Sequence, residues 1–343
     1  MARRPVVFLG VGHPHAAGRA HRLKNVPSLE MKGAFDDDPR LARDFVSQNG
    51  GSAFATVQEA LERASSGLTI IETRNRRAAE LATLAVDRSV AVLLDKPGAH
   101  DVDTLRRLKA DAERKRAFVH VGYHMRYSPS VVRGLEIVKS GALGRITTGR
   151  FHAAVQSPWL TNEWFCDPDD MGGLVFLDAC HVLDILTLCL GRPRSISCRM
   201  KKLVGVPAHP FEDSAAMILD YGDALVAGDV CGWETNDWVE TWNVELYGDL
   251  GTLILGLHPP RLKLWSREAR GDFACGWSEI SHASFDGELN YEYELTDVAD
   301  RLDRGALPGG ATLEEALSLL ELSAQCYQDA RAHGYSGGSE ERR

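Results

Sequence analysis

The chain has 343 residues, of which 44% are hydrophobic, and it carries a formal net charge of −9. This length predicts about two domains, each large enough to bury a core of its own. The negative charge argues against a nucleic-acid partner, because phosphate neutralisation requires clustered lysines and arginines. No stretch of the sequence reaches the ~18 apolar residues of a membrane span, so we expect no membrane partner.

The cysteines and the first strand favour a reducing compartment. Cysteine occurs seven times, an odd number, and no two cysteines form a C-x-x-C pair. Neither a disulfide framework nor a zinc finger is therefore indicated. The apolar run from Val6 to Gly12 is short and broken by glycine, which does not suit a signal peptide. We expect a cytoplasmic protein.

Strands and helices alternate in the first part of the chain. Short apolar runs predict buried strands at residues 5–9, 29–35, 68–71, 90–94 and 118–122. Helical patterns follow the first four of them, at residues 16–23, 39–46, 76–86 and 102–115. This alternation predicts an α/β fold with a doubly wound parallel sheet, a Rossmann domain over residues 1–126.

Beyond Ser128-Pro129 the pattern changes to strands joined by Gly and Asp turns, typical of a mostly antiparallel sheet. We expect these strands at residues 146–154, 195–203, 215–220, 224–231, 241–247 and 251–256. Helices are expected at residues 131–139, 173–190 and 312–331, and Thr312 with Glu315 forms a capping box for the last of them. Residues 127–333 are thus a second, α/β domain with a large open sheet, with helix 312–331 able to pack on the Rossmann domain. Residues 334–343 are expected to be a disordered tail.

The segment Leu94-Asp95-Lys96-Pro97 closes the strand at residues 90–94. Open α/β sheets bind ligands at the carboxyl ends of their strands, where this lysine and carboxylate lie. Pro97 ends the strand and stiffens the turn. Lys96 is therefore a candidate reactive group beside a bound nucleotide.

A nucleotide site is predicted by Gly10-x-Gly12, which lies between a strand and a helix, and by Asp36 at the end of the next strand. Glycine lets the backbone approach a pyrophosphate, and an acid at the end of the second strand binds ribose hydroxyls. His15 replaces the third glycine of the usual motif. The run Asp36-Asp37-Asp38 would repel a 2′-phosphate, and no arginine immediately follows Asp36, so NAD is favoured over NADP.

Histidines 13, 15 and 21 raise the question of a metal site. No carboxylate or cysteine completes a ligand set locally, so we expect no metal. The loop His13-Pro14-His15 is instead expected to contact the cofactor or solvent.

A second group of polar residues, Asp178, His181 and Asp184, interrupts the apolar helix at residues 173–190. Residues three apart are neighbours on a helix, so Asp178 can orient His181. One interpretation is a structural Asp–His pair that satisfies buried polar groups. The other is an acid/base histidine beside a substrate hydroxyl or carbonyl.

Together these motifs resemble the Gfo/Idh/MocA oxidoreductases over nearly the whole chain. The motifs that carry the resemblance occur in the family's order: Gly10-x-Gly12, Asp36, Asp95-Lys96-Pro97, Arg126 with Pro129, Ser140-Gly141-x-x-Gly144, Gly172-Gly173 with His181-x-x-Asp184, Glu212-Asp213, Tyr247-Gly248-x-x-Gly251 and Thr312-x-Glu314-Glu315-Ala316. The resemblance implies NAD(P)-dependent chemistry on sugars, cyclitols and their derivatives. It also implies homodimers or homotetramers that form through the C-terminal sheet.

Three departures from the family pattern concern the site. The usual Glu-Lys-Pro is Asp95-Lys96-Pro97 here, and the usual Thr-Pro-Asn-x-x-His begins at Thr73, keeps Asn75 and ends in Ala78. The resemblance still implies that Thr73 and Asn75 contact the cofactor. The family's acid four residues before the histidine is Leu177 here, and the acid at Asp178 is displaced by about 100° around a helix.

The resemblance implies hydride transfer between nicotinamide and a hydroxyl or keto carbon of a sugar, glycoside or cyclitol. His181 would exchange the hydroxyl proton, Lys96 would stabilise the alkoxide and also contact the cofactor, and Asp178 would tune His181. Further expected contacts with cofactor or substrate are Asp95, Tyr123, Arg126, Trp159, Asn162 and Trp164. Two alternatives remain, namely a redox-neutral, NAD-retaining glycosidase and a non-catalytic NAD or sugar sensor.

Overall fold

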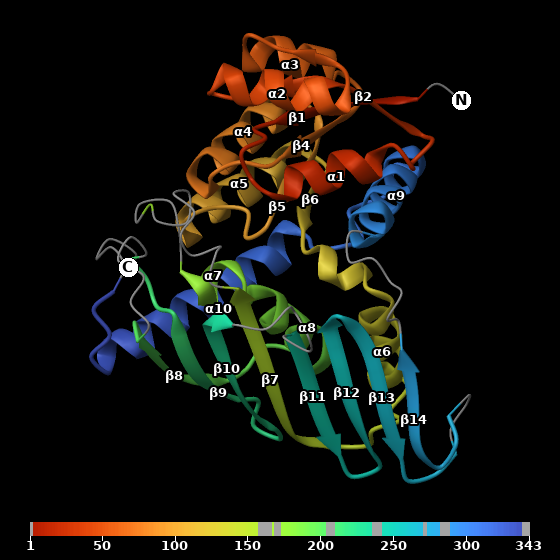
Figure 1. Cartoon of the computed structure of the whole chain (residues 1–343), viewed down its shortest axis with the longest axis vertical. Helices are drawn as coiled ribbons and strands as arrows, with labels where there is room; N and C mark the ends of the chain where they lie inside the picture. Colours follow the sequence, from red (N-terminus) through yellow and green to blue (C-terminus); the bar gives the residue numbers. More distant parts are fainter. Residues whose placement is uncertain are drawn as a thin grey trace. The chain divides into compact units, whose positions relative to one another are not determined.

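The computed structural model describes residues 3–156, 167, 173–203, 210–234, 242–269, 273–281 and 289–337. The chain forms two compact units, each assembled from two segments (Figure 1). The first comprises Met1–His124 and Glu288–Leu320, and the second comprises Met125–Gly287 and Glu321–Arg343. Among the helices that the structure describes, none combines the length and the apolarity that a membrane crossing requires.

The first unit is built on a six-stranded parallel sheet with the order β3-β2-β1-β4-β5-β6. Its strands are β1 (Arg4–Leu9), β2 (Leu29–Phe35), β3 (Ser52–Ala53), β4 (Leu68–Ile71), β5 (Ala91–Asp95) and β6 (Val119–Gly122). The order reverses between β1 and β4, and this switch point is where doubly wound sheets bind nucleotides. The predicted Rossmann fold is confirmed.

Helices connect these strands, namely α1 (His15–Leu23), α2 (Pro39–Asn49), α3 (Val57–Arg63), α4 (Asn75–Asp87) and α5 (Val102–Lys115). Three of them begin where an acceptor side chain caps the first turn: Asp38 for α2, Thr56 for α3 and Asp101 for α5. Pro39 occupies the first turn of α2, as predicted. Helix α3 and strand β3 were not predicted from the sequence.

Helix α9 (Leu289–Arg304) also belongs to the first unit, although residues 123–288 separate it from β6 in the chain. Its residues Leu295, Val298 and Ala299 are buried in the core formed by β1, β2 and α1. The sequence analysis did not identify this helix. Helix α10 (Leu313–Ala332) begins in this unit and ends in the second, and Val121 of β6 donates a 2.9 Å hydrogen bond to the carbonyl of Ala311 just before it.

The second unit contains an eight-stranded sheet with the order β14-β13-β12-β11-β7-β10-β9-β8. Its strands are β7 (Ile146–Gln156), β8 (Ser195–Lys201), β9 (Ser214–Asp220), β10 (Leu225–Glu234), β11 (Trp242–Gly248), β12 (Gly251–His258), β13 (Pro260–Ser266) and β14 (Gly276–Ser281). Only β7 and β10 pair in parallel among these strands. The predicted mostly antiparallel sheet is confirmed, and β13 and β14 extend it beyond the predicted strands.

Helices α6 (Pro129–Lys139) and α8 (Cys180–Leu190) pack on this sheet (Figure 1). The helix predicted at residues 173–190 is in fact two helices, because α7 (Leu174–Leu177) ends after one turn and α8 begins at Cys180. The capping box of α10 is confirmed, since Glu315 accepts from the Thr312 amide at 2.9 Å and donates its own amide to the Thr312 hydroxyl at 3.2 Å. Residues 338–343 of the predicted tail lie outside the described residues.

Gly173, at the start of α7, has a φ of +91°, and a Cβ there would lie 2.1 Å from the Tyr327 hydroxyl and 2.6 Å from a Glu212 carboxylate oxygen. Gly191 has a similar φ of +80°, but a Cβ there would have no atom within 4 Å. We expect Gly173→Ala to destabilise the chain by about 1–3 kcal/mol more than Gly191→Ala, because both share the backbone strain and only the first adds overpacking. Urea unfolding of the two variants measures this, and equal losses would contradict it.

Candidate functional site

The glycine loop after β1 passes closely over the loop after β4. Gly10 has a φ of +82°, and a Cβ on it would lie 2.4 Å from Cβ of Thr73. A Cβ on Gly12 would meet only Leu41, at 3.8 Å, so packing does not require glycine there. The bare backbone of Gly12 instead suits close approach by a ligand.

Asp36 follows β2 and lies beside this loop, as predicted. One of its carboxylate oxygens accepts a 2.8 Å hydrogen bond from the Val11 amide, and the other accepts a 2.9 Å bond from the Asp38 amide. Helix α1 begins just after the loop, and its N-cap residue, Pro14, makes no side-chain capping bond. Amides at a helix N-terminus bind phosphate, so the loop, the helix and Asp36 fit a dinucleotide.

The other two acids of the Asp run are paired with arginines. Arg77 donates to both carboxylate oxygens of Asp37, at 2.7 and 2.9 Å. Arg40 donates to Asp38 at 2.9 Å. The repulsion predicted for a 2′-phosphate therefore comes chiefly from Asp36.

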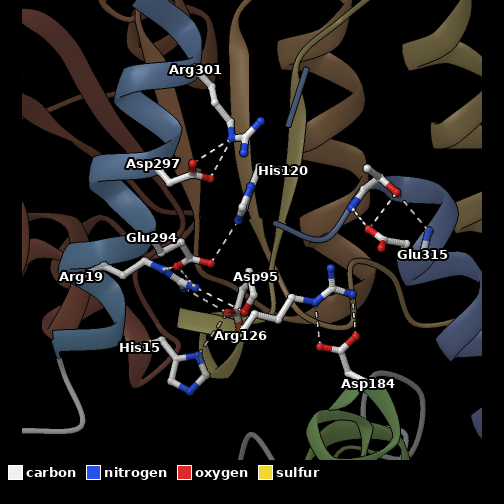
Figure 2. Close-up of polar contacts among 12 residues, drawn as sticks. His15, Arg19, Asp95, His120, Arg126, Asp184, Glu294, Asp297, Arg301 and Glu315 are labelled. Carbon is white, nitrogen blue, oxygen red and sulfur yellow. Dashed lines mark hydrogen bonds and ion pairs between the residues drawn. The ribbon is translucent and has the colours of Figure 1, made fainter. Parts of the chain in front are cut away.

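A buried ionic cluster lies at the carboxyl edge of the parallel sheet, around Arg19 of α1 (Figure 2). Arg19 is 0% exposed and pairs with Glu72 after β4, with Asp95 at the end of β5 at 3.0 Å, and with Glu294 of α9 at 2.9 Å. His120 of β6 bonds to the second oxygen of Glu294 at 3.2 Å. The Arg19 guanidinium thus contacts carboxylates from three segments that lie far apart in the sequence.

Burial and charge act in opposite directions on the pKa values of this cluster. Burial lowers the pKa of Arg19, but Glu294, Glu72 and Asp95 together raise it well above its ordinary value. Burial raises the pKa of Glu72 well above its ordinary value despite the nearby Arg19. For Glu294, burial is outweighed by Arg19 and His120, so its pKa is lowered.

His13 and His15 of the glycine loop approach Asp95. The Nδ1 atom of His15 lies 3.1 Å from Oδ1 of Asp95, and Nδ1 of His13 lies 3.6 Å from Oδ2. Burial lowers the pKa of both histidines, well below the ordinary value for His13. Burial would raise the pKa of Asp95, but His15, His13 and Arg19 lower it well below its ordinary value. Asp95 thus lies ionised between the two histidines and beside Arg19.

Lys96 follows Asp95 and is 5% exposed. Its positive charge contributes to lowering the pKa of His13 and His15, which places it within electrostatic range of the glycine loop. Asn75 begins α4 and Tyr123 follows β6, and these side chains are 4% and 1% exposed. The cofactor-contact residues predicted in this unit thus all lie at the carboxyl ends of strands of one sheet, or on the loops and helix starts that follow them.

In the second unit His181 lies in the first turn of α8 and is 3% exposed. Its ring is 6.0 Å from that of Trp242 on β11. Asp178 lies in the turn between α7 and α8 rather than on a shared helix, and its backbone carbonyl accepts a 3.1 Å bond from the His181 amide. The helical spacing from which we inferred that Asp178 orients His181 is therefore interrupted.

Asp184, one turn along α8, pairs with Arg126 in a bidentate arrangement (Figure 2). Nε and Nη2 of Arg126 donate to the two carboxylate oxygens at 2.8 and 2.5 Å. Asp184 is 2% exposed, so this pair satisfies a charge inside the unit. Arg126 was predicted as a cofactor or substrate contact, and Asp184 fixes its guanidinium.

Glu212 holds the start of α7, the short helix that precedes His181. Its Oε1 accepts a 2.9 Å bond from the Val175 amide and a 2.5 Å bond from the Tyr327 hydroxyl, and Oε2 accepts from Tyr335 at 3.1 Å. Burial raises its pKa in spite of these three donors.

Sequence reasoning missed Arg19, Glu72, His120, Glu294 and His124, whose ring lies 5.3 Å from that of His15. The helical spacing could have indicated that Arg19 is buried, because it lies on the same face of α1 as the buried residues Ala16, Ala20 and Leu23. A second indication existed for Glu72, which directly follows an apolar strand just as Asp95 ends one. Trp159, Asn162 and Trp164, predicted to contact sugar, lie outside the described residues.

Comparison with known proteins agrees with this geometry. Residues 5–123 match an oxidoreductase family with an NAD-binding Rossmann fold, and residues 132–254 match the GFO/IDH/MocA C-terminal domain. The chain belongs to the GFO/IDH/MocA oxidoreductase family. Its first unit is the NAD-binding domain of that family.

Individual relatives of the family are more distant. Inositol 2-dehydrogenase of Rubrobacter xylanophilus is 28% identical over 45% of this chain and 45% of its own length. Glucose-6-phosphate 3-dehydrogenase of Bacillus subtilis is 29% identical over 42% of this chain, and the match spans 39% of that enzyme. The chain thus covers less than half of the length of these curated relatives. A solved levoglucosan dehydrogenase, in complex with NADH and L-sorbose, shares the fold with a TM-score of 0.86 at 14% identity, over 99% of this chain and all of the other.

The raised pKa of Glu212 predicts a pH-dependent stability. The folded state keeps the Glu212 proton above the ordinary value of 4.5, so this proton stabilises the fold at low pH, and the contribution is lost as the pH rises through the raised pKa. Glu212→Gln carries no titrating proton. The free energy of unfolding of the native chain, minus that of the variant, should therefore fall from about pH 4.5 upward, by at most ~1.4 kcal/mol per pH unit. Denaturant titrations across the pH range check this, and parallel curves for the two proteins would refute it.

Proposed function

We propose that this oxidoreductase is an NAD-dependent dehydrogenase of a sugar, glycoside or cyclitol. The observation that carries the proposal is Lys96, buried at the carboxyl edge of the NAD-binding sheet and next to an ionised Asp95. Inositol and a sugar phosphate are the substrates in the names of the relatives, which supports a polyhydroxylated ring as substrate.

NAD, when bound, supplies the hydride acceptor at C4 of its nicotinamide. In the proposed reaction His181 takes the proton of the substrate hydroxyl, or returns it in the reverse direction. Lys96 donates a hydrogen bond to the same oxygen and stabilises its developing negative charge. Asp178 tunes His181, and Tyr123 and Arg126 contact substrate or cofactor. The geometry of Arg126 supports this part, because Asp184 preorganises its guanidinium.

The family's homodimers or homotetramers, formed through the C-terminal sheet, are part of the proposal. Ile218 of β9 and Leu225 of β10 are 51% and 53% exposed, and the register of these strands places both on one face of the sheet. Exposed apolar side chains on one sheet face favour association with a second copy.

The proposed reaction is tested by NADH formation from NAD across a panel of sugars, inositols and aryl glycosides, with bound nucleotide assayed after denaturation. Net NADH formation supports the dehydrogenase. Product formation without NADH, from protein that releases NAD on denaturation, would instead support the redox-neutral glycosidase. A protein that binds NAD and converts no member of the panel in either direction would favour the sensor.

We expect Lys96→Met and His181→Ala each to lower kcat by about 10²- to 10⁴-fold on the substrate found, because each removes a group that stabilises charge or moves a proton. NAD affinity should persist in the His181 variant. His152→Ala is the matched control, because this histidine of β7 pairs with the exposed Asp229, and it should keep full turnover. Unchanged turnover after His181→Ala would eliminate its proposed role.

The choice of NAD over NADP is assigned to Asp36. Asp36→Ser removes the acid that would repel a 2′-phosphate, so the NADP to NAD ratio of kcat/KM should rise at least about tenfold, a difference of ~1.4 kcal/mol. Asp44→Ser, an exposed acid on α2, should leave the ratio unchanged. A ratio that stays constant in the Asp36 variant would remove this residue from cofactor selection.

A further inference from the structure

Four side chains with metal-ligating atoms converge beneath the glycine loop of the first unit. They are His13, His15, Glu72 and Asp95, and one donor atom from each lies within 4.8 Å of all the others. The two histidines come from the loop after β1 and the start of α1, and the two acids follow β4 and end β5. We expected no metal because no carboxylate lies near the histidines in the sequence. The fold brings two carboxylates, Glu72 and Asp95, close to them in space.

Arg19 binds one oxygen of each carboxylate and leaves the other oxygen facing His13. Its Nη1 binds Oε1 of Glu72 and Oδ1 of Asp95. The second oxygens, Oε2 of Glu72 and Oδ2 of Asp95, each lie 3.6 Å from Nδ1 of His13. This distance is too long for a hydrogen bond. It is close to the ~3.4 Å between two ligands of a tetrahedral ion with bonds of about 2.0–2.2 Å.

The Oε2 atom of Glu72 is an independent observation in favour of a ligand. Glu72 is 0% exposed, and this oxygen has no hydrogen-bond partner among the described residues. Buried carboxylate oxygens are rarely left in this state, because each lost bond costs free energy. A cation between Glu72 and His13 would supply the missing partner.

The histidine lone pairs and the local charge are compatible with such a cation. Nδ1 of His13 accepts a 3.2 Å bond from the His15 amide, so this nitrogen carries a lone pair and no proton, and a metal ion would take the place of the amide as partner of that lone pair. Arg19 and Lys96 are the neighbouring cations, and Glu72, Asp95 and Glu294 are the neighbouring carboxylates. When a bound cation displaces the proton of Glu72, three negative charges face Arg19 and Lys96, so one negative charge is left to balance the cation.

We propose that His13, His15, Glu72 and Asp95 bind a divalent first-row transition metal, with Zn²⁺ as the simplest case. Two imidazoles and two carboxylates form a donor set typical of Zn²⁺, Fe²⁺ or Co²⁺, whereas Mg²⁺ and Ca²⁺ take oxygen ligands almost throughout. This site goes beyond the proposed dehydrogenase, which needs no metal.

The test is equilibrium dialysis of the full chain against Zn²⁺ alone, without NAD, with metal content measured per chain after chelator treatment and reloading. We expect one Zn²⁺ per chain. His13→Ala and Glu72→Gln should weaken binding at least about 100-fold, because loss of a supporting partner alone costs about 10- to 100-fold. Co²⁺ loading gives a second readout, since nitrogen and oxygen ligands in a tetrahedral arrangement intensify its visible absorption.

His21→Ala is the matched control, because this exposed histidine lies on the same helix as His15, and its Zn²⁺ binding should equal that of the native chain. Should Glu72→Gln fail to fold, the partly exposed His15→Ala decides instead. A folded native chain without stoichiometric Zn²⁺, or His13 and His15 variants that bind as tightly as the native chain, would overturn the site. Because NAD is absent throughout, neither result depends on the dehydrogenase reaction.

Discussion

The first unit depends on the placement of one guanidinium, that of Arg19, inside the protein. Three buried carboxylates surround it, and each would be costly to bury alone because a desolvated charge loses several kcal/mol of hydration. Removing one partner of such a buried pair destabilises the fold more than replacing both partners with apolar residues, because it leaves an unpaired buried charge. The cluster therefore fixes α1, α9 and the ends of β4 and β5 as a group, since none of the four can move without exposing an unpaired charge.

This cluster also separates the roles of Asp95 and Lys96. Asp95 accepts from Arg19 and from His15, and its pKa lies well below the ordinary value, so it stays ionised near neutral pH. A carboxylate with so low a pKa is a poor general base, because efficient proton transfer needs a pKa near the working pH. In the proposed reaction its role is then electrostatic, because it holds negative charge next to Lys96. A shorter acid than the family's usual glutamate suits this role, because the side chain bonds to Arg19 instead of extending beyond it.

The fold was predictable wherever a local pattern was sufficient. The strands at Leu29–Phe35 and Leu68–Ile71 and the helix at Val102–Lys115 have their predicted bounds, because an apolar run or a capping acid marks each end. Helix α9 was missed because its apolar residues are spaced among charged ones, and its partners Arg19 and Asn25 lie 275 and 267 residues earlier. The break between α7 and α8 was missed because Asp178 and Ala179 do not by themselves end a helix, whereas Gly173 and Glu212 constrain where α7 begins.

The site was predictable in its motifs but not in its pairings. Gly10, Asp36 and Lys96 could be named as candidates because each occupies a fixed place relative to a strand end. Glu72 and Asp95 end adjacent strands and both histidines follow β1, yet their convergence requires the strand order β1-β4-β5, which apolar runs alone do not determine. Single candidate residues could therefore be named from the sequence. The convergence of His13, His15, Glu72 and Asp95 follows only from the topology. Parallel strands bring their carboxyl ends to the same edge of the sheet, however far apart the strands lie in the chain.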